Sequence, residues 1–426
     1  MDPISERLRV RHPQKIDLSL DRVRRLLHAV GDPQNRLPPV VHVAGTNGKG
    51  STVALIRAMA EAAGLAVSVY TSPHLVRFNE RIRLTGRLIE DAELEPILDR
   101  LEAVDDGITA TVFEMTTAAA FLAMAEEPAD LAIIEVGLGG RLDATNVIER
   151  PRLSVITPVD FDHAEFLGTD LFGMAGEKAG ILRRGVPAVV ARQPDAAFQA
   201  IEAVAERLAV PMMVMGRDFD AWAERGGLTF QAEDRLLDLP APALVGLHQI
   251  DNAGVAIAAA LELGLPEAAI SEGLRAVRWP ARMQSLTAGH YADEAKPAGA
   301  ELWLDGGHNP HAARALAEAL AALDLRQPRP TALIAGMLAN KDAEGFFEAF
   351  RLSEAPVFTV PFEGACHPPA DLAEAARRAG LRAEPMADVG TALKAALAEG
   401  AGRILICGSL YLAGEVLGAS PATWPT

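Results

Sequence analysis

The sequence predicts an α/β protein, with a mainly parallel sheet flanked by helices followed by a smaller C-terminal α/β domain. Three observations predict this. A glycine-rich turn within 43–52, VAGTNGKGST, joins an apolar run to a helical pattern. Short apolar runs then alternate with helical patterns along most of the chain, which is typical of βαβ units. The alternation restarts after 286–300, a small, polar segment that contains Gly and Pro.

The first strand and helix enclose the glycine-rich turn. Residues 39–44 (PVVHVA) form an apolar run that predicts a buried parallel strand, and 49–63 has the apolar spacing of a helix. Glycines allow backbone conformations that a Cβ would forbid, so N–H groups can converge on phosphate oxygens at the positive end of the helix. Lys49 adds a charge, and Ser51 or Thr52 offers a hydroxyl for Mg²⁺. The turn therefore predicts a phosphate loop for a nucleoside triphosphate; the alternative is a tight turn alone.

The next elements continue the alternation. Helical patterns such as 115–125 separate the apolar runs, and 212–240 has short apolar pieces that predict a small β-rich insertion. A further helix is expected from Asn252 to about Gly264. The runs that predict strands are 66–72, 130–137, 153–159 and 187–191.

The second domain repeats the pattern on a smaller scale. Its helices are expected to begin at His311, Asp342 and Pro369. Its strands are expected at 301–305, 331–336, 356–360 and 403–409. The resulting domains are 1–285, with the phosphate loop, and 301–426, joined by 286–300 as a linker or exposed hairpin.

Composition excludes several classes of protein. The formal charge of −17 argues against binding to a nucleic-acid backbone. Two cysteines, Cys366 and Cys407, exclude a disulfide scaffold and cannot alone make a zinc site. The N-terminal residues lack the apolar core of a signal peptide, and no run of about eighteen apolar residues suggests a membrane span. We expect no membrane partner and a cytoplasmic location.

Polar residues follow several predicted strands. Ser72, Glu135 and the pair Asp162–His163 each come after an apolar run. The carboxyl ends of parallel strands share one edge of a sheet, so these side chains are expected to gather around the phosphates. Oxygen-rich sets suit Mg²⁺. Taken singly, each residue could instead be a cap or a loop residue.

Two further clusters carry candidate residues. Lys178 lies in GEKAGI, where a lysine beside a glutamate is usually a solvated pair. In LDGGHNPHA, Asp305 ends a strand, while Asn309 suits a helix cap, so this segment could simply be a helix start. Arg282, in WPARMQ, precedes the linker and is expected to reach across the domain cleft.

Together these segments resemble the folylpolyglutamate synthase and dihydrofolate synthase family, ATP-dependent ligases related to the Mur ligases of cell-wall synthesis. The resemblance covers nearly the whole chain, in family order. The matching segments are GTNGKGST (45–52), TSPHLVRFNERI (71–82), EVGLGGRLDATNVI (135–148), DH followed by LG (162–168), GEKAGI (176–181), ARMQ (281–284), DGGHNP (305–310), GMLANKD (336–342) and CGSLYLAGEV (407–416).

The resemblance implies a role for each matching residue. It implies that Lys49 contacts the terminal phosphate of ATP and that Lys178 is a carbamate, with Glu135 and His163 completing the catalytic set. The other implied ATP contacts are Thr46, Asn47, Gly48, Gly50, Ser51, Asn252, Arg282 and Asp305. The implied Mg²⁺ ligands are Ser51, Ser72, Glu135 and His163.

The resemblance also speaks to the substrates. Three segments match those associated with the dihydropteroate pocket in this family, which favours a bifunctional enzyme over one restricted to extending glutamate tails. His308 and Ser409 are candidates for binding L-glutamate. The pocket residues are Ile16, Asp17, Leu18, Thr111, Val112, Phe113, Glu114, Leu142, Asp143 and Ala144.

The predicted activity is ATP- and Mg²⁺-dependent addition of L-glutamate to dihydropteroate and to folates through an acyl phosphate, by a monomer. A monofunctional folylpolyglutamate synthase is one alternative. A Mur-type ligase is another, although such enzymes usually carry an additional N-terminal nucleotide-sugar domain and only about forty residues precede the phosphate loop here. A nucleotide switch and an inactive ligase relative also remain open.

Overall fold

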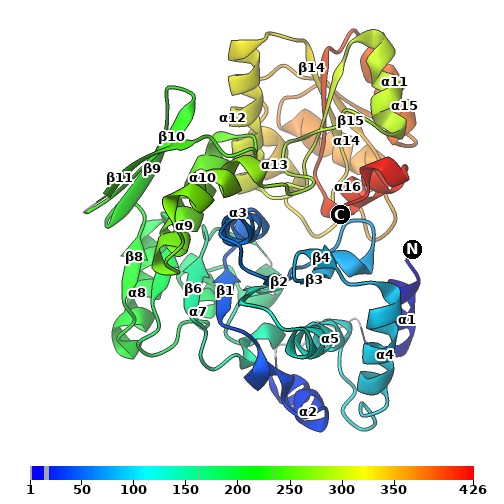
Figure 1. Ribbon diagram of the computed structural model, residues 1–426. Helices are drawn as coiled ribbons and strands as arrows, with labels where there is room; N and C mark the ends of the chain where they lie inside the picture. Colours follow the sequence, from blue (N-terminus) through cyan, green and yellow to red (C-terminus); the bar gives the residue numbers. More distant parts are fainter. Residues whose placement is uncertain (1, 14–18, 163, 234) are drawn as a thin grey trace. The chain divides into compact units, whose positions relative to one another are not determined.

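The computed structural model describes residues 2–13, 19–162, 164–233 and 235–426 (Figure 1). The chain divides into two compact units. The first comprises 1–243, 250–277 and residue 426, and the second comprises 244–249 and 278–425.

The first unit is built on a sheet with the strand order β4-β3-β2-β5-β1-β6-β7-β8. From β2 to β8 all neighbouring pairs are parallel, while β3 and β4 extend one edge as antiparallel strands. The strands are β1 Val40–Ala44, β2 Val67–Tyr70, β3 Ile82–Leu84, β4 Arg87–Leu88, β5 Leu131–Glu135, β6 Leu153–Ile156, β7 Ala188–Val190 and β8 Met212–Val214.

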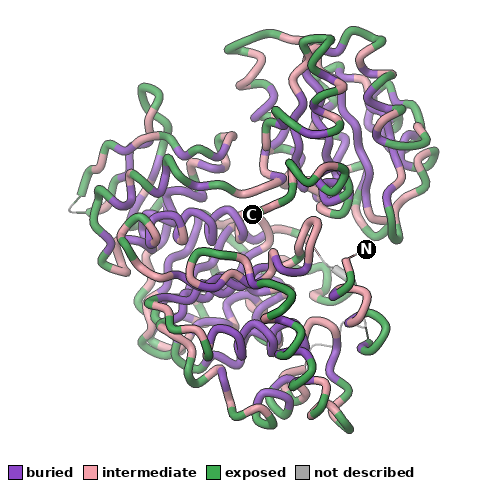
Figure 2. Tube along the Cα trace, turned by 45° about the vertical axis from the view of Figure 1, so that its right-hand side comes forward, coloured by how far each residue is buried: buried purple, intermediate pink, exposed green. Residues whose placement is uncertain are grey.

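Helices cover this sheet, and Figure 2 shows that the buried segments run through the interior of the unit. One core gathers α1, α2, α4 and α5 against the sheet, and another gathers α7 and α8 against β6, β7 and β8. The helices are α1 Pro3–Arg11, α2 Asp21–Ala29, α3 Lys49–Ala62, α4 Asp91–Glu102, α5 Val112–Glu126, α6 Ala164–Leu167, α7 Leu171–Ala179, α8 Asp195–Leu208, α9 Leu247–Glu262 and α10 Glu267–Ala276. Short 3₁₀ turns are η1 Pro33–Arg36, η2 Phe78–Arg81 and η3 Ala144–Val147.

Helix α3 follows the central strand β1 and is buried on almost all sides. It packs on α10, where a Cβ at Gly273 would lie 2.5 Å from the Cα of Met59. This close approach requires glycine. Helix α3 is therefore held between the sheet and a second helix, with the closest approach near its C-terminal end.

The predicted β-rich insertion is present. Strands β9 Phe219–Glu224, β10 Gly227–Ala232 and β11 Arg235–Pro240 form an antiparallel sheet of their own, whereas β8 joins the main sheet. The helix expected from Asn252 begins earlier, because α9 starts at Leu247.

The second unit has the strand order β12-β13-β17-β14-β15-β16, in which only the β12–β13 pair of the described residues is antiparallel. Its strands are β12 Gln284–Ser285, β13 Glu301–Leu304, β14 Thr331–Ala335, β15 Val357–Thr359, β16 Ala383–Pro385 and β17 Arg403–Cys407. Its helices are α11 His290–Ala295, α12 Pro310–Arg326, α13 Ala343–Glu348, α14 Pro369–Arg378, α15 Val389–Ala398 and α16 Leu410–Gly418, with 3₁₀ turns η4 Lys296–Ala298 and η5 Pro421–Thr423.

Strand β17 carries a buried arginine. The Arg403 side chain is 1% exposed, and its guanidinium donates to Glu301 (3.0 Å), to Asp324 and to the carbonyl oxygen of Gln327 (3.1 Å). These partners lie on β13 and at the end of α12. One cation thus joins three elements of the second unit.

The segment predicted as a linker, 286–300, contains α11. Strand β12, just before it, pairs with β13 of the second unit. The domain boundaries at 285 and 301 stay a prediction.

Candidate active site

The turn between β1 and α3 has the shape of an anion-binding loop. Gly45 (φ 150°) and Gly48 (φ 83°) have positive φ, and a Cβ at Gly48 would lie 2.4 Å from Oδ1 of Asn252. No side chain of the described residues caps α3. The N–H groups of its first turn have no partner within the helix, and with the helix dipole they favour an anion.

Further contacts anchor this loop at the edge of the sheet. The N–H groups of Thr46 and Asn47 donate to the carbonyl oxygen of Pro158, at 2.9 and 3.3 Å. The Lys49 ammonium donates to the carbonyl oxygens of Gly45 (3.1 Å) and Thr46 (3.2 Å). The structure therefore brings the predicted ATP residues from Thr46 to Ser51, and Asn252, together in one place.

Gly48→Ala should impair nucleotide use more than its backbone strain alone explains. The added Cβ would collide with Asn252, and the positive φ costs about 1–3 kcal/mol. Gly64→Ala is the matched control, because Gly64 has φ 84° with nothing within 4 Å. We expect Gly48→Ala to lose at least as much thermal stability as Gly64→Ala, and we expect a raised KM for ATP only in Gly48→Ala. Equal KM values in the two variants would refute a role for the contact with Asn252.

The predicted metal residues lie at one edge of the first sheet. Glu135 ends β5, Ser72 follows β2, and Ser51 lies in the first turn of α3 after β1, and these three strands are neighbours. Ser51 and Glu135 are 1% and 5% exposed. His163 lies outside the described residues. Among the residues that are described, no cluster of three or more His, Cys, Asp or Glu side chains is placed to hold a metal.

Lys178 is buried rather than solvated. It lies in α7, is 3% exposed, and its neighbour Glu177 forms an ion pair with Arg141 (2.8 Å). Burial, together with the nearby positive charge of Lys49, lowers the pKa of Lys178 to about 8, although Asp162 and Glu177 oppose this change. The alternative of a solvated pair is therefore wrong, and the structure places a partly neutral amine near the phosphate loop.

One predicted substrate segment, Thr111 to Glu114, lies at the start of α5. Thr111 and Glu114 form a capping box: the N–H of Thr111 donates to Glu114 (2.7 Å), and the N–H of Glu114 donates to Oγ1 of Thr111 (3.3 Å). Val112 N–H donates to the carbonyl oxygen of Pro13 (3.1 Å), and Arg22 pairs with Glu114 (3.0 Å).

Ile16, Asp17 and Leu18 lie outside the described residues. Pro13 and Arg22, on either side of them, both contact the N-terminus of α5. Thr111 and Glu114 have a capping role that sequence reasoning missed, although the T-x-x-E spacing is a sequence sign of it.

The third substrate segment, Leu142 to Ala144, follows the glycine turn after β5. Asp143 is buried, and its carboxylate accepts from the N–H groups of Gly137 (3.1 Å) and Leu138 (2.9 Å). Phe113 of α5 packs on this turn, since a Cβ at Gly137 would lie 2.3 Å from its ring. The structure thus brings the second and third substrate segments together.

In the second unit, Asp305 holds a strained turn that carries Arg282. Ala281 (φ 51°) and Met283 (φ 40°) both have positive φ. The Asp305 carboxylate accepts from the N–H of Met283 (2.7 Å) and the N–H of Gly307 (2.6 Å). The two ATP residues predicted in this unit therefore belong to one cluster.

The candidate glutamate residues lie at the ends of the paired strands β13 and β17. His308 Nδ1 lies 2.9 Å from the carbonyl oxygen of Gly306. Ser409 is buried and caps α16 by accepting from the N–H of Tyr411 (3.0 Å). The N–H of Gly408 donates to the carbonyl oxygen of Gly307 (3.0 Å), which joins the two loops.

Sequence reasoning missed His248. It is half-buried beside Gly246, and its buried Nδ1 has no hydrogen-bond partner among the described residues. Burial lowers the pKa of His248, and the charges of Arg282 and His311 add to this, while Asp305 opposes it. The charges of the Arg282 cluster thus act on this histidine, and the positions of these residues in the sequence do not reveal that interaction.

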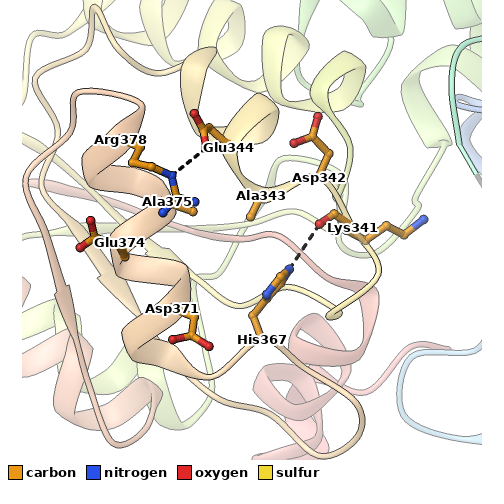
Figure 3. A pocket seen from close by; sticks show the side chains of 9 residues that line it. All are labelled: Lys341, Asp342, Ala343, Glu344, His367, Asp371, Glu374, Ala375 and Arg378. Carbon is orange, nitrogen blue, oxygen red and sulfur yellow. Dashed lines mark hydrogen bonds and ion pairs between the residues drawn. The ribbon is translucent and has the colours of Figure 1, made fainter.

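The second unit also holds a pocket of about 460 Å³ between α13 and α14 (Figure 3). Arg378 donates to Glu344 across it (2.8 Å), and His367 contacts the carbonyl oxygen of Lys341 (3.3 Å). Its lining is Lys341, Asp342, Ala343, Glu344, His367, Asp371, Glu374, Ala375 and Arg378. The predicted site residues lie elsewhere.

Comparison with known proteins identifies the family. Residues 43–260 match the model of the Mur ligase middle domain, and 291–410 match that of the Mur ligase glutamate ligase domain. The chain is 36% identical over 417 residues to the folylpolyglutamate synthase of Lacticaseibacillus casei, covering 93% of this chain and 92% of that protein. The chain belongs to the folylpolyglutamate synthase and dihydrofolate synthase family.

Other family members carry both activities in their names. The dihydrofolate synthase/folylpolyglutamate synthase of Bacillus subtilis is 38% identical over 320 residues, covering 71% of each chain. The structure of Escherichia coli FolC in complex with DHPP and ADP has a TM-score of 0.85 at 31% identity, covering 96% of this chain and 95% of that one. A bifunctional enzyme of the family, solved with Mn, AMPPNP and L-glutamate bound, also has a TM-score of 0.85, at 33% identity and 98% coverage of both chains.

Membership of this family confirms the fold class and the enzyme class predicted from the sequence, an ATP-dependent ligase of folate metabolism. It rules out the reading of the chain as a member of a nucleotide-switch family. In the part of the chain that is described, no helix is both long and apolar enough to cross a membrane.

Proposed function

We propose that this enzyme adds L-glutamate to dihydropteroate, giving dihydrofolate, and to folates, giving polyglutamates, at the expense of ATP. The observation that carries the proposal is the uncapped start of α3 behind Gly48, with Lys49 beside it and Asn252 against it. Two relatives that match this chain over most of their length are named for both activities. Their names support two activities rather than tail extension alone.

The chemistry follows from the poor reactivity of a carboxylate. Transfer of the γ-phosphoryl group of ATP to a carboxylate oxygen of the acceptor gives an acyl phosphate and ADP. The amine of glutamate then attacks the acyl carbon, the amide bond forms, and phosphate leaves as the amine loses a proton. The loop N–H groups and Lys49 would hold the phosphates and neutralise their charge, which is most of the catalysis that such a transfer needs.

A divalent cation fits the first unit by the chemistry of the donors. Hydroxyl and carboxylate oxygens of Ser51, Ser72 and Glu135 come from neighbouring strand ends, and Mg²⁺ prefers such oxygen ligands while sharing substrate phosphates. We propose that these residues hold Mg²⁺ together with His163. When bound, the cation would supply charge neutralisation at the phosphates.

We propose that Lys178 is carbamylated. A pKa of about 8 leaves about a quarter of this amine neutral at pH 7.5. The neutral Nζ can attack CO₂, losing a proton to solvent and becoming an anionic carbamate. A negative charge at this position would relieve the repulsion between Lys178 and Lys49 and could support the Mg²⁺ site.

The remaining assignments are proposals that rest on the matching motifs. Asn252, Arg282 and Asp305 contact ATP, and His308 and Ser409 contact glutamate. The three substrate segments form the site for the pterin part of the acceptor. We also propose a cytoplasmic monomer without a nucleic-acid or membrane partner, organised as 1–285 and 301–426.

An acceptor-dependence assay tests the proposal. The purified protein should release ADP and phosphate only when glutamate and either dihydropteroate or tetrahydrofolate are both present, with one amide formed for each ADP. ADP release without amide product would refute the ligase reaction. Turnover with tetrahydrofolate but not dihydropteroate would establish a monofunctional folylpolyglutamate synthase instead.

A further inference from the structure

The carboxylate of Asp143 is fully used by the protein itself. One oxygen accepts from the N–H groups of Gly137 (3.1 Å) and Leu138 (2.9 Å). The other accepts from the N–H (3.0 Å) and the hydroxyl (2.6 Å) of Thr145. A carboxylate offers about four acceptor positions, so these four donors leave little capacity for a substrate. Asp143 is also only 2% exposed.

The hydrogen bonds continue from Thr145 into the central strand. His42, on β1, is fully buried, and its Nε2 lies 2.9 Å from Oγ1 of Thr145. The one hydroxyl hydrogen of Thr145 points to Asp143, so Oγ1 must accept and Nε2 must carry the proton. Burial, with the charge of Arg183, lowers the pKa of His42 to about 3, which keeps the ring neutral, and the hydrogen bond to Thr145 selects this tautomer.

The turn held by Asp143 supports a residue of the acceptor site. A Cβ at Gly137 would lie 2.3 Å from Cζ of Phe113, so the ring of Phe113 rests on the backbone of this turn. The Phe113 ring centroid also lies 6.4 Å from that of Tyr70. A shift of the turn therefore moves the aromatic ring.

We propose that His42, Thr145 and Asp143 form a positioning relay that fixes the Gly137–Leu138 turn beneath Phe113 and thereby shapes the site for the pterin-bearing acceptor. In this relay Asp143 acts through the turn and does not touch the acceptor. The identity of the acceptor rests on the proposed function, whereas the relay rests on the hydrogen bonds.

Thr145→Val and Thr145→Ser test the relay as a matched pair. Valine keeps the shape of threonine but removes the hydroxyl, while serine keeps the hydroxyl. We expect valine to raise the KM for dihydropteroate about tenfold, since hydrogen bonds to charged groups are the stronger ones. The KM for ATP should change less than twofold, and serine should restore most of the acceptor KM. Calorimetric binding of dihydropteroate gives a second readout that does not need turnover.

A valine enzyme with the acceptor KM of the parent, or a serine enzyme as impaired as the valine enzyme, overturns the relay. Equal rises in the KM for ATP and for the acceptor also overturn it, because they indicate general loosening. If the valine enzyme does not fold, His42→Gln and His42→Leu provide the same comparison, since only glutamine retains a donor. If the parent enzyme makes no amide with dihydropteroate, the proposed function is refuted and the relay is not. In that case the calorimetric affinities of the parent, valine and serine proteins for dihydropteroate test the relay.

Discussion

Lys49→Ala is expected to lower kcat about a thousandfold, the loss seen when one preorganised charge-stabilising donor is removed from an active site. The ammonium lies within 3.1–3.2 Å of two carbonyl oxygens of the loop, so it is held where the phosphates are proposed to bind. Phosphoryl transfer depends mainly on positioning and charge neutralisation, and alanine removes the only side-chain cation in 45–52.

Lys394→Ala is the control for this prediction. Lys394 is exposed and pairs with Glu294 (3.5 Å) in the second unit, so its loss should leave kcat unchanged. The measurement is the rate of ADP release by each variant and by the parent enzyme, with glutamate and acceptor at saturating concentrations. A Lys49→Ala enzyme that keeps more than a tenth of the parent rate would refute the phosphate role.

Lys178→Ala is expected to remove most activity and to regain part of it when a short carboxylic acid such as acetate is added. The added anion would occupy the place of the carbamate. Lys178→Arg keeps a positive charge but cannot form a carbamate, so it should be as inactive as alanine. Native mass spectrometry should show one added CO₂ on the parent enzyme and none on either variant.

The pH dependence of this modification has a defined sign. CO₂ reacts only with the neutral amine, and the neutral fraction rises as the pH increases through the lowered pKa of about 8. At constant dissolved CO₂, carbamylation and activity should therefore increase together from pH 6.5 to 8. Activity that is independent of CO₂ over this range would contradict the carbamate.

Much of the fold could be predicted because the strands of a parallel sheet are apolar on both faces. The runs at β1, β5, β6, β7 and β17 are continuous and bounded by turn residues, so their positions were clear. The hairpin of β3 and β4 was not predicted, because these strands are short and extend an edge. Helix α11 was not predicted either, since its six residues lie among Gly and Pro residues that indicate a loop.

For the candidate site, the sequence predicts where the residues lie in the fold better than it predicts their contacts. The ends of parallel strands determine where polar side chains gather, which placed Ser72 and Glu135 correctly at one edge. Whether a buried polar side chain binds the ligand or caps the backbone depends on interatomic distances, which the spacing of residues in the sequence does not give. Glu114 illustrates this, because it both caps α5 and pairs with Arg22. The burial of Lys178 likewise depends on the packing of the glycine turn against α7, where a Cβ at Gly140 would lie 2.6 Å from the carbonyl oxygen of Glu177.

The buried guanidinium of Arg403 has a consequence for how the second unit assembles. Its acidic partners Glu301 and Asp324 precede it by 102 and 79 positions. Glu301 also pairs with Arg329 (3.2 Å), but the ion pair with Asp324 can form only after the last strand has been synthesised. A ribosome-bound chain that stops before β17 should therefore remain sensitive to protease across β13 and α12. Once residues 403–426 have left the ribosome, β13, α12 and β17 should become resistant to protease together. Resistance of β13 before that point would contradict this order of assembly.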